Sequence, residues 1–415
     1  MEYGIRARRA RVLTVAHLRP GIDELTVELE HLEHEDGPGE HGPGARHAPD
    51  VPAEDEPAKV GGGGAMPGKG VPQRALLFPA LTGLARPGDR VLLNTTAVHL
   101  GLGTGGYHFV MAVDGGQETD LAGRGHIMKL RYTPWQLRVL AVEEPASPHH
   151  QVLQDMDSLG GRPVVALGLH SQLAPVALAL KLETGFKARL AYCMTDGAAL
   201  PLAFSEQVAQ LKEAGWLDLT VTVGHAFGGD LEAVTIWSGM LAAVGVGGAD
   251  AVVIGMGPGV VGTGTRWGTT ALEQAPLLDA AHRLGGHPIA VLRLAGADPR
   301  PRHRGVSHHS LTVLGRLVSC RCDVPLPRLE AGELSALIDA QLKESGIAER
   351  HHLVTVDAWP VLHEARRRGI RFSTMGRGVD EDPVPFLAAA AAGLHAARIA
   401  GNARRAERGD EAGEG

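Results

Sequence analysis

The chain has 415 residues, of which 44% are hydrophobic and 21% are charged, and its formal net charge is −7. This composition is that of an ordinary globular protein with a substantial core, and the length argues for two or three domains. The negative charge provides no global basic field that would favour nucleic acid or a membrane surface as a partner. Cys193, Cys320 and Cys322 form no Cys-x-x-Cys pair, which argues against a disulfide scaffold and fits a reducing cytosol.

The sequence also argues against membrane-related segments. The apolar run at residues 12–16 is too short for a secretory signal. Residues 237–262 are mostly apolar, but they include Asp250, Pro258 and several glycines, which a membrane helix would not tolerate well. We therefore expect a cytoplasmic protein.

The N-terminal region is predicted to be a small β-barrel-like domain over residues 1–145. Residues 5–30 alternate apolar and polar positions around the turn Arg19-Pro20-Gly21, which predicts a β-hairpin with one buried face. Strand-like runs follow at 90–95 and 107–113, and residues 127–142 read as the last element of this domain or its bridge to the next. The glycine-rich loop at 100–106 either turns a hairpin or faces a ligand.

Residues 31–70 interrupt this domain. They are rich in Gly, Pro, acidic residues and His, and they include four consecutive glycines at 61–64. Such a segment cannot bury enough apolar surface to order itself, so a disordered insertion is predicted. Its histidines, which could bind metal opportunistically, are more simply read as part of a solvated tract: His31, His34, His41 and His47.

From residue 146 to 400 the pattern changes to strands that alternate with helices, which predicts a doubly wound, mostly parallel α/β sheet domain. Residues 401–415 read as a charged, frayed tail. The main strands are expected at 163–168, 188–193, 219–223, 250–255 and 288–294, with short strands near 319–324 and 352–356. Helices are expected at 172–183, 203–214, 231–244, 269–284, 308–317, 333–344, 359–368 and 384–399.

Residues 249–271 read as a buried strand, a glycine-rich loop and a helix. Backbone N–H groups of such a loop can close on an anion, and the helix N-terminus adds its dipole. The loop residues expected to bind the ligand are Gly257, Gly259, Gly262, Thr263, Thr265 and Arg266.

The three glycines of this loop match Gly-x-Gly-x-x-Gly. The acidic residue that a dinucleotide site needs about 20 residues later is absent, and no Lys-Ser or Lys-Thr pair forms a Walker-type loop. The alternative is that the glycines serve only tight turning and close packing.

Polar residues follow the predicted strands at their carboxyl ends, where ligands bind in open α/β sheets. The expected acid–base groups are His170, Asp196, His225, Asp230 and His308. After the fifth strand, the segment with Arg300, Arg302 and Arg304 is either a solvated loop or an anion clamp. There the residues expected to contact the ligand are His303, Arg304, Ser307 and His309. The sequence thus predicts that residues scattered from 170 to 309 converge at one edge.

Simpler explanations exist for these residues. Ser171, Asp230 and Ser307 stand where helix N-caps belong, and single histidines are often structural. The sequence around Ser171 lacks the second glycine of a nucleophile elbow. Cys320 and Cys322 match no zinc motif, so no metal site is predicted, and the cofactor is left unknown.

Several long motifs resemble an uncharacterised bacterial family, domain of unknown function 3866 (DUF3866). They are LNTTAVHLGLGTGGYHFV, MTDGAALP, VTVGHAFGGDLEAV, GPGVVGTGTRWG, RHRGVSHHSLT and STMGRGVDEDP. The resemblance covers nearly the whole chain apart from 31–70 and the tail. It implies one unit with a small β domain fused to an α/β domain, and it carries no activity with it. Residues 376–382 differ from the family's Gly-Arg-Gly-Leu-Asp-Glu-Asp only by Val379; this acidic cluster either binds a cation or begins the final helix.

These observations predict a cytosolic enzyme, of unassigned reaction class, that acts on a small phosphate- or carboxylate-bearing metabolite held by the 257–266 loop. One alternative is a non-catalytic ligand sensor with the same pocket. The other is a nucleic-acid-binding protein that uses the β domain, supported only by Tyr107, Phe109 and the N-terminal arginines. A homo-oligomer is left open.

Overall fold

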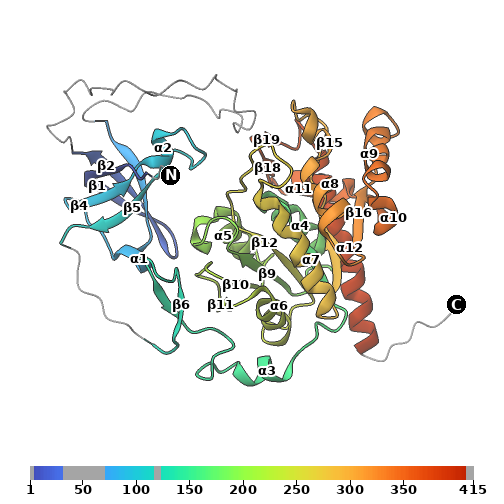
Figure 1. The fold of residues 1–415 in the computed structure, drawn as a ribbon, viewed down its shortest axis with the longest axis horizontal. Coiled ribbons are helices and arrows are strands. Elements are labelled where there is room, and N and C mark those ends of the chain that lie inside the picture. The colour runs from blue at the N-terminus through green and yellow to red at the C-terminus, as the bar shows by residue number, and fades with distance from the viewer. Residues whose placement is uncertain (1–3, 31–70, 116–122, 408–415) are drawn as a thin grey trace, which may run out of the picture. The chain divides into compact units, whose positions relative to one another are not determined.

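The computed structural model describes residues 4–30, 71–115 and 123–407. They belong to two compact units, Met1–Ala122 and Gly123–Gly415 (Figure 1). The insertion predicted at 31–70 lies outside the described residues, as do residues 408–415.

The first unit is a closed five-stranded barrel, as the sequence predicted. Its strands are β1 (Ala7–Arg19), β2 (Ile22–Leu29), β3 (Gln73–Leu77), β4 (Arg90–Asn94) and β5 (His108–Val113), in the order β1-β2-β3-β5-β4, with short helices α1 (Pro79–Thr82) and α2 (Thr96–His99). Alternating residues of the strands, such as Val12, Leu25 and Leu93, fill its interior. This two-residue period is the reason that the hairpin was readable in the sequence.

The second unit contains an eight-stranded sheet whose strand pairs are all parallel. The order is β11-β10-β9-β12-β8-β13-β16-β17. The strands are β8 (Pro163–Ala166), β9 (Leu190–Thr195), β10 (Leu219–Thr222), β11 (Leu231–Glu232), β12 (Ala251–Met256), β13 (His287–Ala290), β16 (Asp323–Pro327) and β17 (His352–Val356). The central strands are apolar and buried along their whole length because helices cover both faces.

Helices pack on both faces of this sheet. One face carries α4 (Leu173–Glu183), α5 (Glu206–Glu213), α11 (Trp359–Arg367) and α12 (Val384–Glu407). The other carries α3 (His150–Asp155), α6 (Ile236–Gly245), α7 (Gln274–Arg283), α8 (His308–Thr312), the π-helical turn η5 (Val313–Leu317), α9 (Glu333–Glu344) and α10 (Ile347–Arg350). The short 3-10 turns are η1 (His170–Gln172), η2 (Leu202–Phe204), η3 (Thr270–Glu273) and η4 (Pro301–His303). The remaining strands form two-stranded sheets and are β6 (Ile127–Lys129), β7 (Leu137–Val139), β14 (Leu294–Ala295), β15 (Gly305–Val306), β18 (Ser373–Thr374) and β19 (Arg377–Gly378).

The chain changes direction between β8 and β12, which are neighbours in the sheet. Strand β8 leads into α4 on one face, and β12 leads through η3 into α7 on the other. The two connections therefore diverge and leave space beyond the carboxyl ends of these strands, which is where open α/β sheets bind ligands. This arrangement confirms the predicted doubly wound sheet and fixes where a site is expected.

The boundary between the units differs from the expected position at residue 145. The hairpin of β6 and β7 belongs to the second unit because Lys129 is fully buried there. Its ammonium group donates to the carbonyl oxygens of Thr222 (3.3 Å), Ala226 (2.9 Å) and Ala233 (3.1 Å), and lies 3.2 Å from Glu232 Oε2. A lysine that replaces its water shell with carbonyls is not visible in a hydrophobicity pattern.

Further elements differ from their expected bounds; for example, β16 spans Asp323–Pro327 where a short strand was expected near 319–324, and β13 ends at Ala290 where a strand was expected to 294. Residues 231–232 form β11 instead of starting a helix, because they pair with β10. Helix α12 continues to Glu407, so the first residues of the expected tail are helical. Residues 384–403 of α12 are long and apolar enough to cross a membrane, but 72% of the most apolar stretch is buried, as in the core helix of a soluble protein.

Candidate functional site

Two buried glutamines hold the carboxyl ends of β8 and β13 from opposite faces. The Gln172 side chain accepts from the N–H groups of Gly168 (2.9 Å) and Leu169 (3.0 Å) and donates to the Leu292 carbonyl (3.1 Å). Gln274 donates to the carbonyls of Ala166 (2.8 Å) and Val291 (2.9 Å). These bonds satisfy backbone groups at the strand ends and just beyond them. The two glutamines therefore hold the backbone at the carboxyl ends of β8 and β13 in a defined position.

A basic cluster lies beyond the end of β13. We define it as Arg293, Arg300, Arg302, Arg377, His303, His308 and His309, with Asp298 as its carboxylate. Asp298 pairs with Arg300 through two bonds of 3.0 Å and with Arg377 through one of 3.0 Å. The Arg293 Nη1 atom lies 3.1 Å from His309 Nδ1. Two guanidiniums, of Arg300 and Arg377, thus share one carboxylate.

The pKa values of this cluster reflect burial and positive charge. Burial and the nearby Arg300 lower the pKa of Arg293 to about 10. Burial alone would raise the pKa of Asp298, but the hydrogen bonds from Arg300 and Arg377 hold it well below its usual range. A negative group is therefore favoured at this position.

The three histidines of the cluster are in ring contact. Their ring centroids lie 5.0 Å (His303–His308), 5.3 Å (His303–His309) and 4.2 Å (His308–His309) apart. Burial, followed by the charge of Arg293, lowers the pKa of His303 to about 2 and that of His309 to about 3. Both imidazoles are neutral at neutral pH, so they can accept or donate a hydrogen bond without adding charge.

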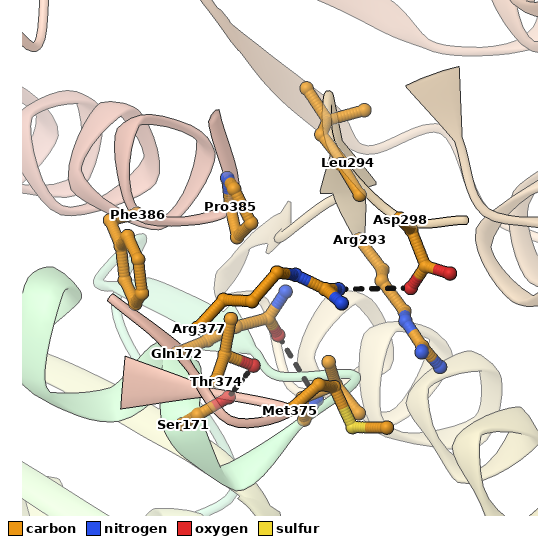
Figure 2. Close-up of a pocket in the computed structure, with 12 residues that line it drawn as sticks. Ser171, Gln172, Arg293, Leu294, Asp298, Thr374, Met375, Arg377, Pro385 and Phe386 are labelled. Carbon is orange, nitrogen blue, oxygen red and sulfur yellow. Dashed lines mark hydrogen bonds and ion pairs between the residues drawn. The ribbon is translucent and has the colours of Figure 1, made fainter. Parts of the chain in front are cut away.

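A small pocket opens beside these arginines (Figure 2). Arg377 crosses it toward Asp298, and the hydroxyls of Ser171 and Thr374 meet at 2.9 Å on its wall. Its lining residues are Leu169, Ser171, Gln172, Arg293, Leu294, Ala295, Asp298, Thr374, Met375, Arg377, Pro385 and Phe386. Met375 has a left-handed backbone, with φ of 50°, which a side chain rarely adopts and which clusters at functional sites.

The predicted glycine-rich loop follows β12 and reaches the basic cluster. Gly257 packs so closely on the Ala199 carbonyl that a Cβ would lie 2.9 Å from its oxygen. The loop then forms a short hairpin, in which the Thr263 N–H donates to the Gly268 carbonyl (2.9 Å). A Cβ on Gly262 would lie 3.7 Å from the His309 ring. The loop therefore connects the end of β9 to the histidines.

The remaining predicted loop residues are solvent-exposed. Gly259, Thr263, Thr265 and Arg266 lie on the exposed part of the loop. Arg266 and His308 line one open pocket on the side of α8. The structure thus places Arg266 in one pocket with the predicted His308. Gly257 has a packing role, as in the alternative interpretation of the glycines.

An acidic group lies at the end of β9. The exposed Asp196 accepts the backbone N–H of His225 (2.9 Å), and Glu273 from η3 packs so tightly on Gly197 that a Cβ there would lie 2.6 Å from Glu273 Oε2. Burial raises the pKa of Glu273, and the charge of Asp196 raises it further. A carboxyl with a raised pKa beside a second carboxyl occurs in acid–base catalysts.

Other predicted residues have structural partners. His170 Nε2 lies 2.7 Å from Ser205 Oγ and its Nδ1 lies 3.2 Å from Tyr192 OH, while burial lowers its pKa to about 4. His225 Nδ1 accepts the Leu130 N–H (3.0 Å). Asp230 bonds Lys212 and both the N–H and hydroxyl of Thr220, so it lies beside the start of β10 and not at the carboxyl edge.

Two further predicted residues lie next to the basic cluster. Ser307 caps α8 by accepting the His309 N–H (3.4 Å), and it also bonds His303 Nδ1 (2.8 Å). The Arg304 side chain is exposed, and its carbonyl accepts from Gln341 (3.2 Å). The N-cap that the simpler explanation proposed for Ser307 is therefore present, together with a contact to the cluster.

Sequence reasoning missed Arg293, Arg377, Glu273 and the two glutamines. Arg293 was included in an expected strand, and Glu273 in an expected helix. Arg377 belongs to a Gly-Arg-Gly motif that was noticed for its acidic end alone. In a single sequence, nothing distinguishes one charged residue beside a turn as part of a binding site.

The fold defines an α/β protein with a doubly wound parallel sheet and an N-terminal barrel. The model of the family described as "Protein of unknown function (DUF3866)" matches residues 74–393. Because this match spans well over half of the chain, the protein belongs to that family, as its motifs predicted. No curated protein and no solved structure matches the chain.

Within the described residues, one group of side chains has the spacing of metal ligands. It consists of His287, Asp323 and His395. His287 and Asp323 begin β13 and β16, so the group lies at the amino edge of the sheet, opposite the basic cluster. The carboxyl edge therefore supports anion binding, and the amino edge has the donors for a cation.

Proposed function

We propose that the protein is an enzyme that acts on a small phosphate- or carboxylate-bearing metabolite at the carboxyl edge of its sheet. The observation that carries this proposal is the state of Arg293. Among the described residues, its guanidinium has a hydrogen bond to neutral His309 and no ion pair, although other guanidiniums surround it. An anionic group would supply the missing countercharge through charge-assisted hydrogen bonds.

The small pocket next to Arg293 and Arg377 fits one anionic group and not a whole nucleotide. The hydroxyls of Ser171 and Thr374 supply further donors on its wall. The rest of a metabolite would extend along the 257–268 loop toward β9. This places the anion on side chains beyond β13, with the loop in the role of a flanking contact.

Glu273 is the group that we assign to proton transfer. Burial raises its pKa, and the neighbouring Asp196 provides a second carboxyl. His170, by contrast, is bonded to Tyr192 and Ser205 and acts as a structural residue. The proposed chemistry is therefore acid–base, carried by carboxyls.

We also propose a cytoplasmic location and no membrane partner. The three cysteines are free thiols, which fits a reducing compartment. A nucleic-acid role for the barrel has less support, since Arg74 covers the Tyr107 ring at 4.2 Å and the Tyr107 hydroxyl bonds Glu24 at 2.7 Å. One face of that ring is therefore already occupied by a guanidinium and is not available for a base to stack on.

The anion site is tested with sulfate, whose charge does not change above acidic pH. The melting temperature is measured against sulfate at constant ionic strength in wild type, R293K and R377Q. We expect the apparent affinity to fall at least about tenfold in each variant, because each loses a charge-assisted hydrogen bond. The matched control is R328Q, an exposed arginine just beyond β16. Equal stabilisation of all four proteins by sulfate would indicate a general salt effect and would contradict the proposed anion site.

The catalytic part is tested by turnover. A metabolite extract is incubated with wild type or E273Q, and consumed compounds are identified by mass spectrometry. We expect acidic metabolites to be consumed by wild type and spared by E273Q, with sulfate binding retained in both. Sulfate binding without any consumption would identify a sensor instead of an enzyme.

A further inference from the structure

Three histidines surround one carboxylate at the amino edge of the sheet. His287, Asp323 and His352 are the first residues of the adjacent strands β13, β16 and β17, and His395 comes from α12, which packs against β16. Their alignment follows from the parallel order β13-β16-β17, because the amino ends of neighbouring parallel strands lie side by side. The cluster is a consequence of topology that no local sequence motif reveals.

The donor atoms of this cluster converge. His287 Nε2 lies 2.7 Å from Asp323 Oδ2, and His395 Nε2 lies 2.5 Å from the same oxygen. The ligand atoms of these three side chains all lie within 4.8 Å of one another. His352 Nδ1 lies 3.1 Å from the other carboxylate oxygen, Oδ1. Two imidazoles and one carboxylate therefore face a common centre, and a third imidazole orients the carboxylate.

We infer that His287, Asp323 and His395 bind a divalent transition-metal ion, with zinc as the ion that this donor set fits best. Two histidines and one carboxylate are the protein ligands of many catalytic zinc sites, which keep a fourth position open. Zinc bonds of about 2.0–2.2 Å require only a small outward movement of side chains that already point at one another. His352 is a positioning residue that holds the carboxylate from outside the coordination sphere.

The open position would face solvent through a neighbouring pocket. This pocket, of about 480 Å³, is lined by His282, Gly286, His287, Pro288, Arg321, Cys322, Asp323 and His352. Asp323 is nearly buried and the His395 side chain is 13% exposed, so the site has a protected side as well as an open one. The bound ion would thus be accessible to water or to a small ligand from one direction.

Asp323 supplies one negative charge to a bound cation, and each imidazole offers the lone pair of a ring nitrogen. The site is independent of the proposed anion site, which lies at the other end of the same strands.

The test is a titration of the full-length, chelator-treated protein with Zn²⁺, followed by calorimetry, and with Co²⁺, followed by its visible absorption. Wild type is expected to bind one Zn²⁺ per chain at this site and to give the absorption of a four-coordinate Co²⁺ ion. H287Q and H395Q should each weaken the affinity by more than about 100-fold, since loss of a ligand costs more than loss of an outer-shell partner. H352Q should weaken it less.

The controls separate this site from other histidines. H363Q changes an exposed histidine of α11 and should leave binding unchanged. A variant with glutamine at positions 31, 34, 41 and 47 removes the histidines of the insertion and should retain the bound ion. Absence of binding in wild type, or binding that survives H287Q and H395Q but is lost in the insertion variant, would overturn the proposal and leave a hydrogen-bonded cluster.

Discussion

The guanidinium of Arg293 and the imidazole of His309 lie 3.1 Å apart, and burial, followed by the charge of Arg293, lowers the pKa of His309 to about 3. The histidine accepts a hydrogen bond through Nδ1, and a proton there would face the arginine directly. His309 is thus the acceptor for the charged Arg293. Because a proton on His309 would oppose this contact, the stability of the folded protein depends on pH.

We predict that stability falls as the pH drops from 6.5 to 5. The folded-state pKa of His309, about 3, and of His303, about 2, are below the unfolded value of 6.5. In this window the unfolded chain takes up protons that the folded protein does not, so acid favours unfolding; above pH 6.5 the contribution is fully present. Each buried histidine should contribute about 1.5 kcal/mol to the loss over this interval.

Chemical denaturation at the two pH values checks this prediction. H309N keeps a hydrogen-bonding side chain without the titration, so its pH-dependent loss should be smaller than that of wild type by about 1.5 kcal/mol. H363N, at an exposed position of α11, is the matched control and should behave as wild type. An H309N loss equal to that of wild type would mean that His309 is protonated in the folded protein.

Lys129 is predicted to be essential for the stability of the second unit. Its substitution by methionine leaves the carbonyls of Ala226 and Ala233 without their donor and Glu232 without its cation, in a fully buried position. Breaking a buried pair by removing one partner costs about 3–5 kcal/mol.

The measurement is the free energy of unfolding in urea. K212M removes the exposed Lys212–Asp230 pair and should cost no more than about 1 kcal/mol. The double variant K129M/E232Q should recover part of the loss, because it removes the unpaired carboxylate. A K129M protein as stable as K212M would show that water reaches the Lys129 site.

Gln274 is predicted to support the site through the backbone. In Q274L the Val291 carbonyl loses its side-chain donor and the Ala166 carbonyl keeps only the Val291 N–H (3.2 Å), while the side-chain volume is nearly retained. A buried group left unsatisfied costs about 1–3 kcal/mol, so the unfolding free energy should fall by at least that amount. Q210L, which removes an exposed bond of 2.9 Å to Glu206 within α5, is the control and should be close to neutral.

The periodic parts of the fold were predictable from the sequence. The fully apolar run of β12 reflects a strand that is buried along its whole length. The bounds of α9 follow from the spacing of its apolar residues. The candidate site was predictable only in part. The convergence of Arg266 with His308 follows from sheet topology, but Asp230 is placed beside Thr220 because its carboxylate satisfies the start of β10.

What could not be predicted depends on pairs distant in sequence. Lys129 meets carbonyls about a hundred residues away, and the Arg377–Asp298 pair joins segments separated by 79 residues. Such pairs depend on the three-dimensional course of the chain, and a single sequence contains no record of them. The clustering of His287 with His395 is of the same kind.

The last prediction concerns Arg266. A variant at this position tests whether the 257–268 loop contributes to anion binding in addition to the basic cluster. The side chain is exposed on the 257–268 loop and lines a pocket with His308, whose ring contacts His309. A guanidinium just before the N-terminus of η3 is repelled by the helix dipole unless an anion is present. R266A should therefore leave the melting temperature without ligand unchanged or slightly higher, while reducing the stabilisation by sulfate. If R266A is instead destabilised and binds sulfate as wild type does, Arg266 has a structural role, and the anion is held by Arg293 and Arg377 without help from the loop.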